Sequence, residues 1–195
     1  MTTLLLVRHG ETDWNAEQRW QGHADQPLND DGRAQARAAG EALYGRRVDA
    51  VYASDLRRAH ETAELIAARL DLPVETDVRP REVDVGDWSG RLVSEIEATD
   101  PAAFATWRAG GKAWSGGESY EEMGERVVAA VLDLARRHPG ETLVIVTHGG
   151  SIRACRATAA GLSYAESRVS AIGSMANCEV VELRVADDRL TVPIG

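Results

Sequence analysis

The chain has 195 residues, of which 44% are hydrophobic and 27% charged, and its formal net charge is −9 at pH 7. A chain of this length and composition is expected to fold as a single globular domain over residues 1–195. Its negative charge argues against nucleic acid or an anionic membrane as partner, because both attract a basic surface. The apolar run near the N-terminus has only four residues, so neither a signal peptide nor a membrane span is expected. Cys155 and Cys178 have no metal-site or disulfide spacing, which predicts a cytoplasmic protein.

Short apolar strands alternate with amphipathic helices along the chain. This alternation predicts parallel strands with helices on both faces, and therefore a three-layer α/β/α sandwich with a mainly parallel central sheet. Ser54 or Asp55 is expected to cap the second helix, and Ser119 with Glu122 forms an S-x-x-E capping box for a long third helix. The expected strands lie at 3–8, 49–54, 73–76 and 142–150, followed by a hairpin within 178–194, and the expected helices at 30–44, 55–70, 119–138 and 151–160.

Residues 80–118 form an irregular segment rich in Gly and Trp, with short helical patches around 92–98 and 101–108. We expect this cap segment to cover the ligand crevice. Trp107 and Trp114 are expected to form an apolar wall that selects bulky or aromatic leaving groups. Trp14 and Trp88 are expected to pack loops onto the sheet instead.

Two strands end in the same pair of residues. "LLLVRHG" ends at Arg8-His9-Gly10, and "VTHGG" contains His148-Gly149 at the end of the most apolar strand. Ligands of parallel α/β sheets bind beyond the carboxyl ends of the strands. One histidine at a strand end is usually a packing residue, but two at equivalent ends predict that both imidazoles lie in one crevice.

The stretch "SDLRRAHET" places Arg57 and Arg58 in the first turn of a helix. A helix N-terminus favours anions and disfavours cations, so an inward-facing arginine there fits an anion shared with the helix. Arg58 directly precedes Ala59, the first apolar position of the inward stripe. We therefore expect Arg58 to face the crevice and Arg57 to be solvated.

The segment "RPREVDVGDWSG" carries three candidate acids, Glu82, Asp84 and Asp87. A carboxylic acid beside a bound dianion holds its proton more tightly, because like charges repel. Such a group can act as a general acid near neutral pH. Spacing alone does not choose among the three.

Six segments stand in an order that resembles the histidine phosphatase superfamily, the phosphoglycerate-mutase-like proteins. They are "LLLVRHGETDWN", "QGHADQPLNDDGRAQA", "SDLRRAHET", "REVDVGDWSG", "GGES" and "VTHGG", and they extend from Leu4 to about Gly150. The resemblance implies the phosphoglycerate mutase-like fold and a phosphatase that acts through a phosphohistidine intermediate on small phosphorylated metabolites.

The resemblance also implies roles for individual residues. His9 matches the nucleophile that becomes phosphohistidine, and Glu82 matches the proton donor. The remaining matches are phosphate- or substrate-binding positions: Arg8, Arg58 and His148 in a phosphate-binding ring that also serves catalysis, and Asn15, Gln21 and Gly149 lining the pocket. Arginines and imidazoles then supply the positive charge, so no metal and no cofactor is expected.

Three alternatives stay open at this point. A cofactor-dependent phosphoglycerate mutase would share these residues, but the short cap segment and the "REVDVGDWSG" context favour the phosphatase branch. A non-catalytic phospho-ligand binding module would be expected to lack His9, Arg58, Glu82 or His148, and all four are present. A zinc hydrolase built on the two histidines would lose its activity in EDTA. The sequence indicates neither the natural substrate nor the oligomeric state.

Overall fold

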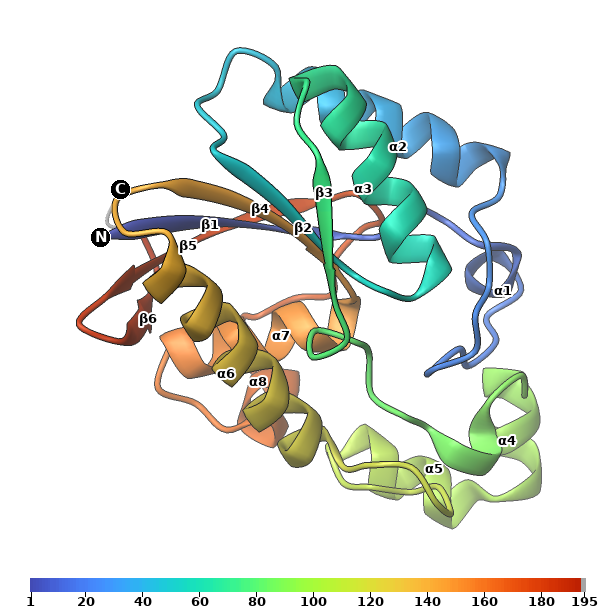
Figure 1. Ribbon diagram of the computed structural model, residues 1–195. Helices are drawn as coiled ribbons and strands as arrows, with labels where there is room; N and C mark the ends of the chain where they lie inside the picture. Colours follow the sequence, from blue (N-terminus) through green and yellow to red (C-terminus); the bar gives the residue numbers. More distant parts are fainter. Residues whose placement is uncertain (194–195) are drawn as a thin grey trace.

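The computed structural model describes residues 1–193, so Ile194, the last residue of the expected hairpin, lies outside the described part. Its centre is a six-stranded sheet (Figure 1). The strands, in spatial order, are β3 (Val74–Asp77), β2 (Ala50–Ser54), β4 (Thr142–Thr147), β1 (Thr2–Arg8), β5 (Val180–Ala186) and β6 (Arg189–Thr191). The first four are mutually parallel, whereas β5 and β6 form an antiparallel hairpin beside β1. The expected mainly parallel sheet is confirmed.

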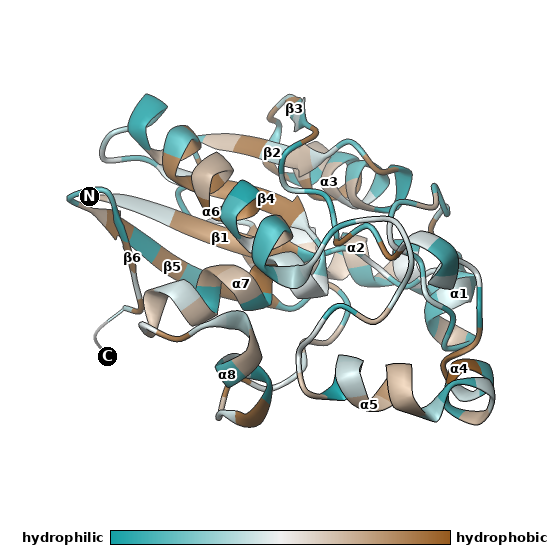
Figure 2. Cartoon of the chain, turned by 90° about the horizontal axis from the view of Figure 1, so that it is seen from below, coloured by the Kyte–Doolittle hydropathy of each residue, from teal (hydrophilic) through white to brown (hydrophobic). Residues whose placement is uncertain are grey.

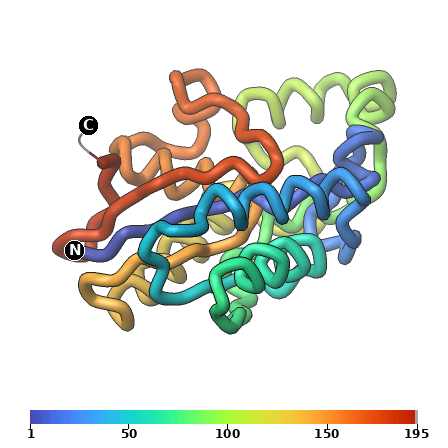
Figure 3. Tube along the Cα trace, turned by 90° about the horizontal axis from the view of Figure 1, so that it is seen from above, coloured from blue at the N-terminus to red at the C-terminus, as the bar shows by residue number. Residues whose placement is uncertain are grey.

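Helices cover both faces of this sheet, as the alternating pattern predicted. The longer ones are α2 (Asp30–Leu43), α3 (Arg57–Leu70), α6 (Tyr120–Arg137) and α7 (Gly149–Ala159), and the short ones are α1 (Asp13–Ala16), α4 (Val93–Thr99), α5 (Pro101–Arg108) and α8 (Tyr164–Val169). Figure 3 shows α2 and α3 side by side on one face. Among residues 1–193, no helix combines the length and apolarity needed to cross a membrane.

The side chains of β1 divide between two apolar cores. Leu5 and Val7 join the core beneath α2 and α3, whereas Leu4 and Leu6 join the core beneath α6 and α7. Successive strand residues point to opposite faces, so a strand buried on both sides needs a continuous apolar run. Figure 2 shows this as hydrophobic central strands between helices whose outer faces are hydrophilic.

Two helix starts differ from the sequence prediction. Leu56 is the N-cap of α3 and makes no side-chain capping bond, so the expected cap at Ser54 or Asp55 is wrong. The Ser54 hydroxyl instead bonds His148, and the Asp55 carboxylate pairs with Arg81 at 2.7 Å. The helix expected at 151 begins two residues earlier, because His148 itself is the N-cap of α7.

The cap segment lies beyond the carboxyl ends of the parallel strands, where α4 and α5 extend away from the sheet (Figure 1). Trp20 holds it in place by packing against three other tryptophans, Trp88, Trp107 and Trp114, at ring-centroid distances of 5.2, 5.1 and 6.1 Å. The two helical patches expected in this segment are α4 and α5. The short helices α1 and α8 were not among the helices expected from the sequence.

Candidate active site

The ends of β1 and β4 bring two histidines together. The strands are paired in parallel with Arg8 opposite Thr147, and the backbone N–H of His9 donates to the Thr147 carbonyl at 2.9 Å. His9 and His148 therefore follow directly on neighbouring strand ends. Their ring centroids are 5.3 Å apart. The predicted convergence of the two imidazoles is thus present in the structure.

The His9 ring is only 4% exposed and is held in one tautomer. Its Nδ1 lies 2.7 Å from the Gly10 carbonyl oxygen, which can only accept, so Nδ1 carries the hydrogen and Nε2 keeps its lone pair. Burial lowers the pKa of His9 well below its usual value, and the neighbouring Arg58 and Arg8 lower it further. His9 is therefore a neutral base at neutral pH.

Arg58 is fully buried at the first turn of α3, whereas Arg57 is exposed, as the helical spacing predicted. Its Nη1 and Nη2 each donate at 2.8 Å, to the carbonyls of Ala24 and Gly22, which fixes the plane of the guanidinium. Burial lowers the pKa of Arg58 to about 10, so the group stays charged at neutral pH. Its Nε is buried without a hydrogen-bond partner within the described chain.

Arg8 and His148 each carry a similar unpaired nitrogen. Arg8 donates from Nη1 to the Met175 carbonyl at 2.5 Å, and its Nε has no partner among residues 1–193. His148 is completely buried, with Nε2 2.9 Å from the Ser54 hydroxyl, and its Nδ1 has no partner in the part of the chain that the structure describes. Buried donors without partners are costly, about 1–3 kcal/mol each. The guanidinium donors of this group suit an oxyanion such as a phosphoryl group.

Glu82 is the one of the three candidate acids that lines the pocket. Its Oε2 accepts the N–H of Gly150 at 3.0 Å, and its Oε1 accepts the N–H of Val83 at 2.9 Å. Asp84 and Asp87 instead accept backbone N–H groups within the cap segment. The tertiary structure thus separates Glu82 from Asp84 and Asp87, which residue spacing alone could not do.

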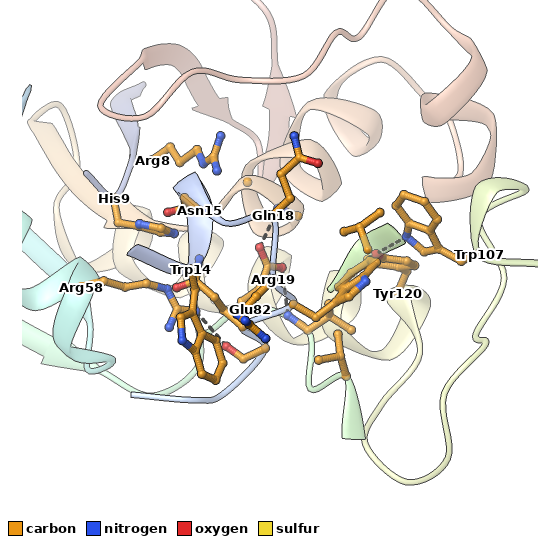
Figure 4. A pocket seen from close by; sticks show the side chains of 18 of the residues that line it. Arg8, His9, Trp14, Asn15, Gln18, Arg19, Arg58, Glu82, Trp107 and Tyr120 are labelled. Atoms are coloured by element: carbon orange, nitrogen blue, oxygen red, sulfur yellow. Dashed lines mark hydrogen bonds between the residues drawn. The ribbon is translucent and has the colours of Figure 1, made fainter. Parts of the chain in front are cut away.

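Arg8, His9 and Arg58 line a cavity of about 290 Å³. The completely buried His148 lies beside His9 but does not itself line the cavity, so the expectation that both imidazoles enter one crevice holds for His9 alone. Figure 4 shows Arg8, His9 and Arg58 at one end and Trp107 and Tyr120 at the other. The cavity is also lined by three further expected residues, Asn15, Gln21 and Gly149, by Glu82, and by the side chains of Trp14, Trp20, Val83, Val85, Val93 and Tyr164.

The expected tryptophan wall needs correction. Trp107 lines the cavity, but Trp114 does not: it is buried in the core, and its Nε1 donates to the Glu118 carbonyl at 2.9 Å. Trp20 takes the place expected of Trp114, because it enters the cavity while packing on the other tryptophans. Trp88 packs in the core as expected, whereas Trp14 also lines the cavity.

The pocket residues that the sequence analysis missed are mainly Trp20, Tyr120 and Tyr164. Tyr120 and Tyr164 stack at 4.2 Å, and Tyr120 accepts a hydrogen bond from Trp107 Nε1 at 3.0 Å. Tyr120 directly follows Ser119, the first residue of the predicted capping box, and Tyr164 follows Ser163, which forms a second S-x-x-E box with Glu166. That second box was the available signal for α8.

Comparisons with known proteins agree with this geometry. A model of the histidine phosphatase superfamily (branch 1) matches residues 4–193. The chain is 39% identical to phosphoglycerate mutase-like protein 4 of Arabidopsis thaliana, over 98% of this chain and 83% of the relative. It is 38% identical to glucosyl-3-phosphoglycerate phosphatase of Mycolicibacterium vanbaalenii, over 92% and 83% of the two chains.

The fold also matches solved structures of such proteins. A mycobacterial glucosyl-3-phosphoglycerate phosphatase in complex with VO3 superimposes with a TM-score of 0.90 at 36% identity, covering 98% of this chain and 97% of the other. The family model matches nearly the whole sequence, and the relatives and the solved structure are similar over most of their length, so the family of this chain is established. The chain belongs to the histidine phosphatase superfamily, branch 1.

Proposed function

We propose that this chain is a phosphatase that hydrolyses phosphomonoesters of small metabolites through a phosphohistidine formed on His9. The observation that carries the proposal is the state of His9, which is neutral, keeps the lone pair of Nε2, and lies beside the buried guanidinium of Arg58 and the partly buried guanidinium of Arg8. Phosphoryl transfer needs positioning of the nucleophile and cationic stabilisation of the phosphoryl oxygens. Arg8 and Arg58 supply the charge, and the Nδ1–H bond to Gly10 orients the ring.

In the first half-reaction the lone pair of His9 Nε2 attacks phosphorus and the bond to the ester oxygen breaks. Glu82, in its protonated form, gives its proton to the leaving oxygen, and the alcohol departs. In the second half-reaction the Glu82 carboxylate takes a proton from water as that water attacks phosphohistidine. Inorganic phosphate leaves, His9 is neutral again, and Glu82 is again protonated.

The apolar half of the cavity supports a preference for bulky or aromatic leaving groups. Trp107 and Trp20 offer faces and edges on which such a group can pack, and Val83 and Val93 add aliphatic surface. We place the activity in the cytoplasm on account of the free Cys155 and Cys178.

The test is a burst and steady-state assay of the purified protein with p-nitrophenyl phosphate, in the presence and absence of EDTA. We expect turnover that EDTA does not diminish, and an acid-labile phosphoenzyme when the reaction is quenched rapidly. His9→Ala should abolish both. Binding of phosphate without turnover would establish a non-catalytic module instead, and phosphoglycerate mutase activity above the rate of hydrolysis would establish a mutase.

A further inference from the structure

Arg126 lies on α6, outside the cavity, and forms hydrogen bonds along the segment that carries Glu82. Its Nη1 donates to the carbonyls of Arg79 at 2.5 Å and Arg81 at 3.2 Å, and its Nη2 donates to the Glu82 carbonyl at 3.3 Å. The Glu118 carboxylate receives both Nε, at 3.3 Å, and Nη2. One guanidinium thus joins three backbone carbonyls and one carboxylate.

The segment that Arg126 holds is fixed by side chains: Thr147 Oγ1 donates to the Pro80 carbonyl at 2.5 Å and Ser151 Oγ to the Arg81 carbonyl at 3.0 Å, and Arg126 binds three carbonyls of the same segment. Residues 78–85 form neither helix nor strand, so no ladder of backbone hydrogen bonds fixes them. The Glu82 carboxylate accepts the N–H of its neighbour Val83 and the N–H of Gly150, 68 residues away at the start of α7. The position of the carboxyl group in the cavity therefore depends on the bond to Gly150 and on where the backbone at residue 82 lies.

A second group reaches the same carbonyl from the other side. His23 Nε2 is 2.8 Å from the Glu82 carbonyl oxygen, which accepts its hydrogen. His23 stands between Gly22 and Ala24, whose carbonyls hold the Arg58 guanidinium. The Glu82 backbone is thereby tied to Arg126 on α6 and to the loop that orients Arg58.

We propose that Arg126 is a positioning residue for the proton donor: by binding the carbonyls of residues 79, 81 and 82 it fixes the Glu82 carboxyl group beside the leaving oxygen. The inference rests on the phosphatase function proposed above. Arg126 touches no reacting atom and acts through Glu82. A residue with this role affects proton transfer to the leaving group more than it affects binding of the phosphoryl group.

The experiment compares two aryl esters of similar shape, phenyl phosphate and 2,4-dinitrophenyl phosphate. The phenyl ester needs a proton on its leaving oxygen, whereas dinitrophenolate departs without one. We expect Arg126→Met to lower kcat/KM for phenyl phosphate about 10- to 100-fold, a fraction of the ~10²–10⁴-fold that general acids contribute. The loss for 2,4-dinitrophenyl phosphate should stay within about 3-fold, since it depends little on that acid. Arg136→Met, at an exposed position of the same helix paired with Asp188, is the matched control and should change neither rate.

A double-mutant cycle separates positioning from a general loss of structure. Adding Arg126→Met to Glu82→Gln should not lower the rate with phenyl phosphate further, because the group that Arg126 positions is already disabled. Equal losses on both esters, additive effects in the cycle, or no effect of Arg126→Met would overturn the inference. If Arg126→Met does not fold, Arg126→Lys decides the same comparison, since lysine keeps the charge but cannot reach all these acceptors. A wild-type protein that hydrolyses neither ester would refute the proposed function itself.

Discussion

His9 and His148 lie at equivalent positions, each one residue beyond the end of its strand, with their ring centroids 5.3 Å apart. The parallel pairing of Arg8 with Thr147 places them there, because residues that follow paired positions lie side by side at the same edge of the sheet. Burial is the first cause of the lowered pKa in both rings, and Arg58 lowers each further. The fixed positive charge of the site is therefore carried by guanidiniums, and the imidazoles are neutral at neutral pH.

Arg58→Met should weaken the binding of inorganic phosphate about 10- to 100-fold, because a hydrogen bond to a charged group contributes about 1.5–3 kcal/mol and about 1.4 kcal/mol corresponds to tenfold. Isothermal titration calorimetry measures the change. Arg57→Met is the control, since the neighbouring side chain is exposed. Equal affinity in the wild type and Arg58→Met would remove this arginine from the proposed phosphate site.

The ordinary pKa of a histidine side chain is about 6.5. The His9 ring should remain the neutral Nδ1–H tautomer well below that pH. The reason is that burial and two nearby cations disfavour its protonation. Two-dimensional ¹H–¹⁵N spectra of the imidazole nitrogens, recorded from pH 8 to about 5, report tautomer and charge directly. A ring that becomes doubly protonated around pH 6.5 would contradict the prediction.

The free energy of unfolding should fall as the pH drops below about 6.5. Both histidines have a lower pKa in the folded than in the unfolded chain, so the unfolded state binds protons first and gains stability from them. Each group contributes a slope of up to about 1.4 kcal/mol per pH unit between its two pKa values. Above the pKa of the histidine in the unfolded chain, its contribution to the free energy of unfolding no longer changes with pH.

Urea unfolding of His148→Gln between pH 5 and 8 tests this dependence. Its slope below about pH 6.5 should be shallower than that of the wild type, since one titrating group is gone. Ser54→Ala removes the hydrogen-bond partner of His148 without removing a titrating group and should keep the steeper slope. Identical slopes in wild type and His148→Gln would show that this ring does not contribute.

Trp107→Ala should lower kcat/KM for 1-naphthyl phosphate relative to glycerol phosphate by about 2- to 10-fold, because an aromatic contact contributes about 0.5–1.5 kcal/mol. The ratio of the two rates is the measurement. Trp114→Phe is the matched control: its ring lies in the core, so the substitution should lower the melting temperature and leave the ratio unchanged. An unchanged ratio in Trp107→Ala would show that the leaving group does not reach this ring.

Local pattern was sufficient for much of the fold. The continuous apolar runs of β1 and β4 predicted buried parallel strands, and helical spacing separated the buried Arg58 from the exposed Arg57. The Ser119–Glu122 box predicted the start of α6 correctly, because both of its hydrogen bonds are local. The predicted cap at Ser54 was wrong because the Ser54 hydroxyl forms a long-range bond: it contacts His148, 94 residues away, and does not cap the next helix.

The sequence by itself determined the order of strands and helices and the presence of histidines and arginines at strand and helix ends, because periodicity and capping act over a few residues. Residue spacing did not distinguish Glu82 from Asp84 and Asp87; the family resemblance singled out Glu82, and the tertiary structure shows that it lines the cavity. Only the tertiary structure decided that Trp20 lines the cavity while Trp114 does not. Those outcomes depend on contacts between distant segments, such as Arg126 on the carbonyls beside Glu82. No local pattern of residues encodes such long-range contacts, because they form only when the layers pack.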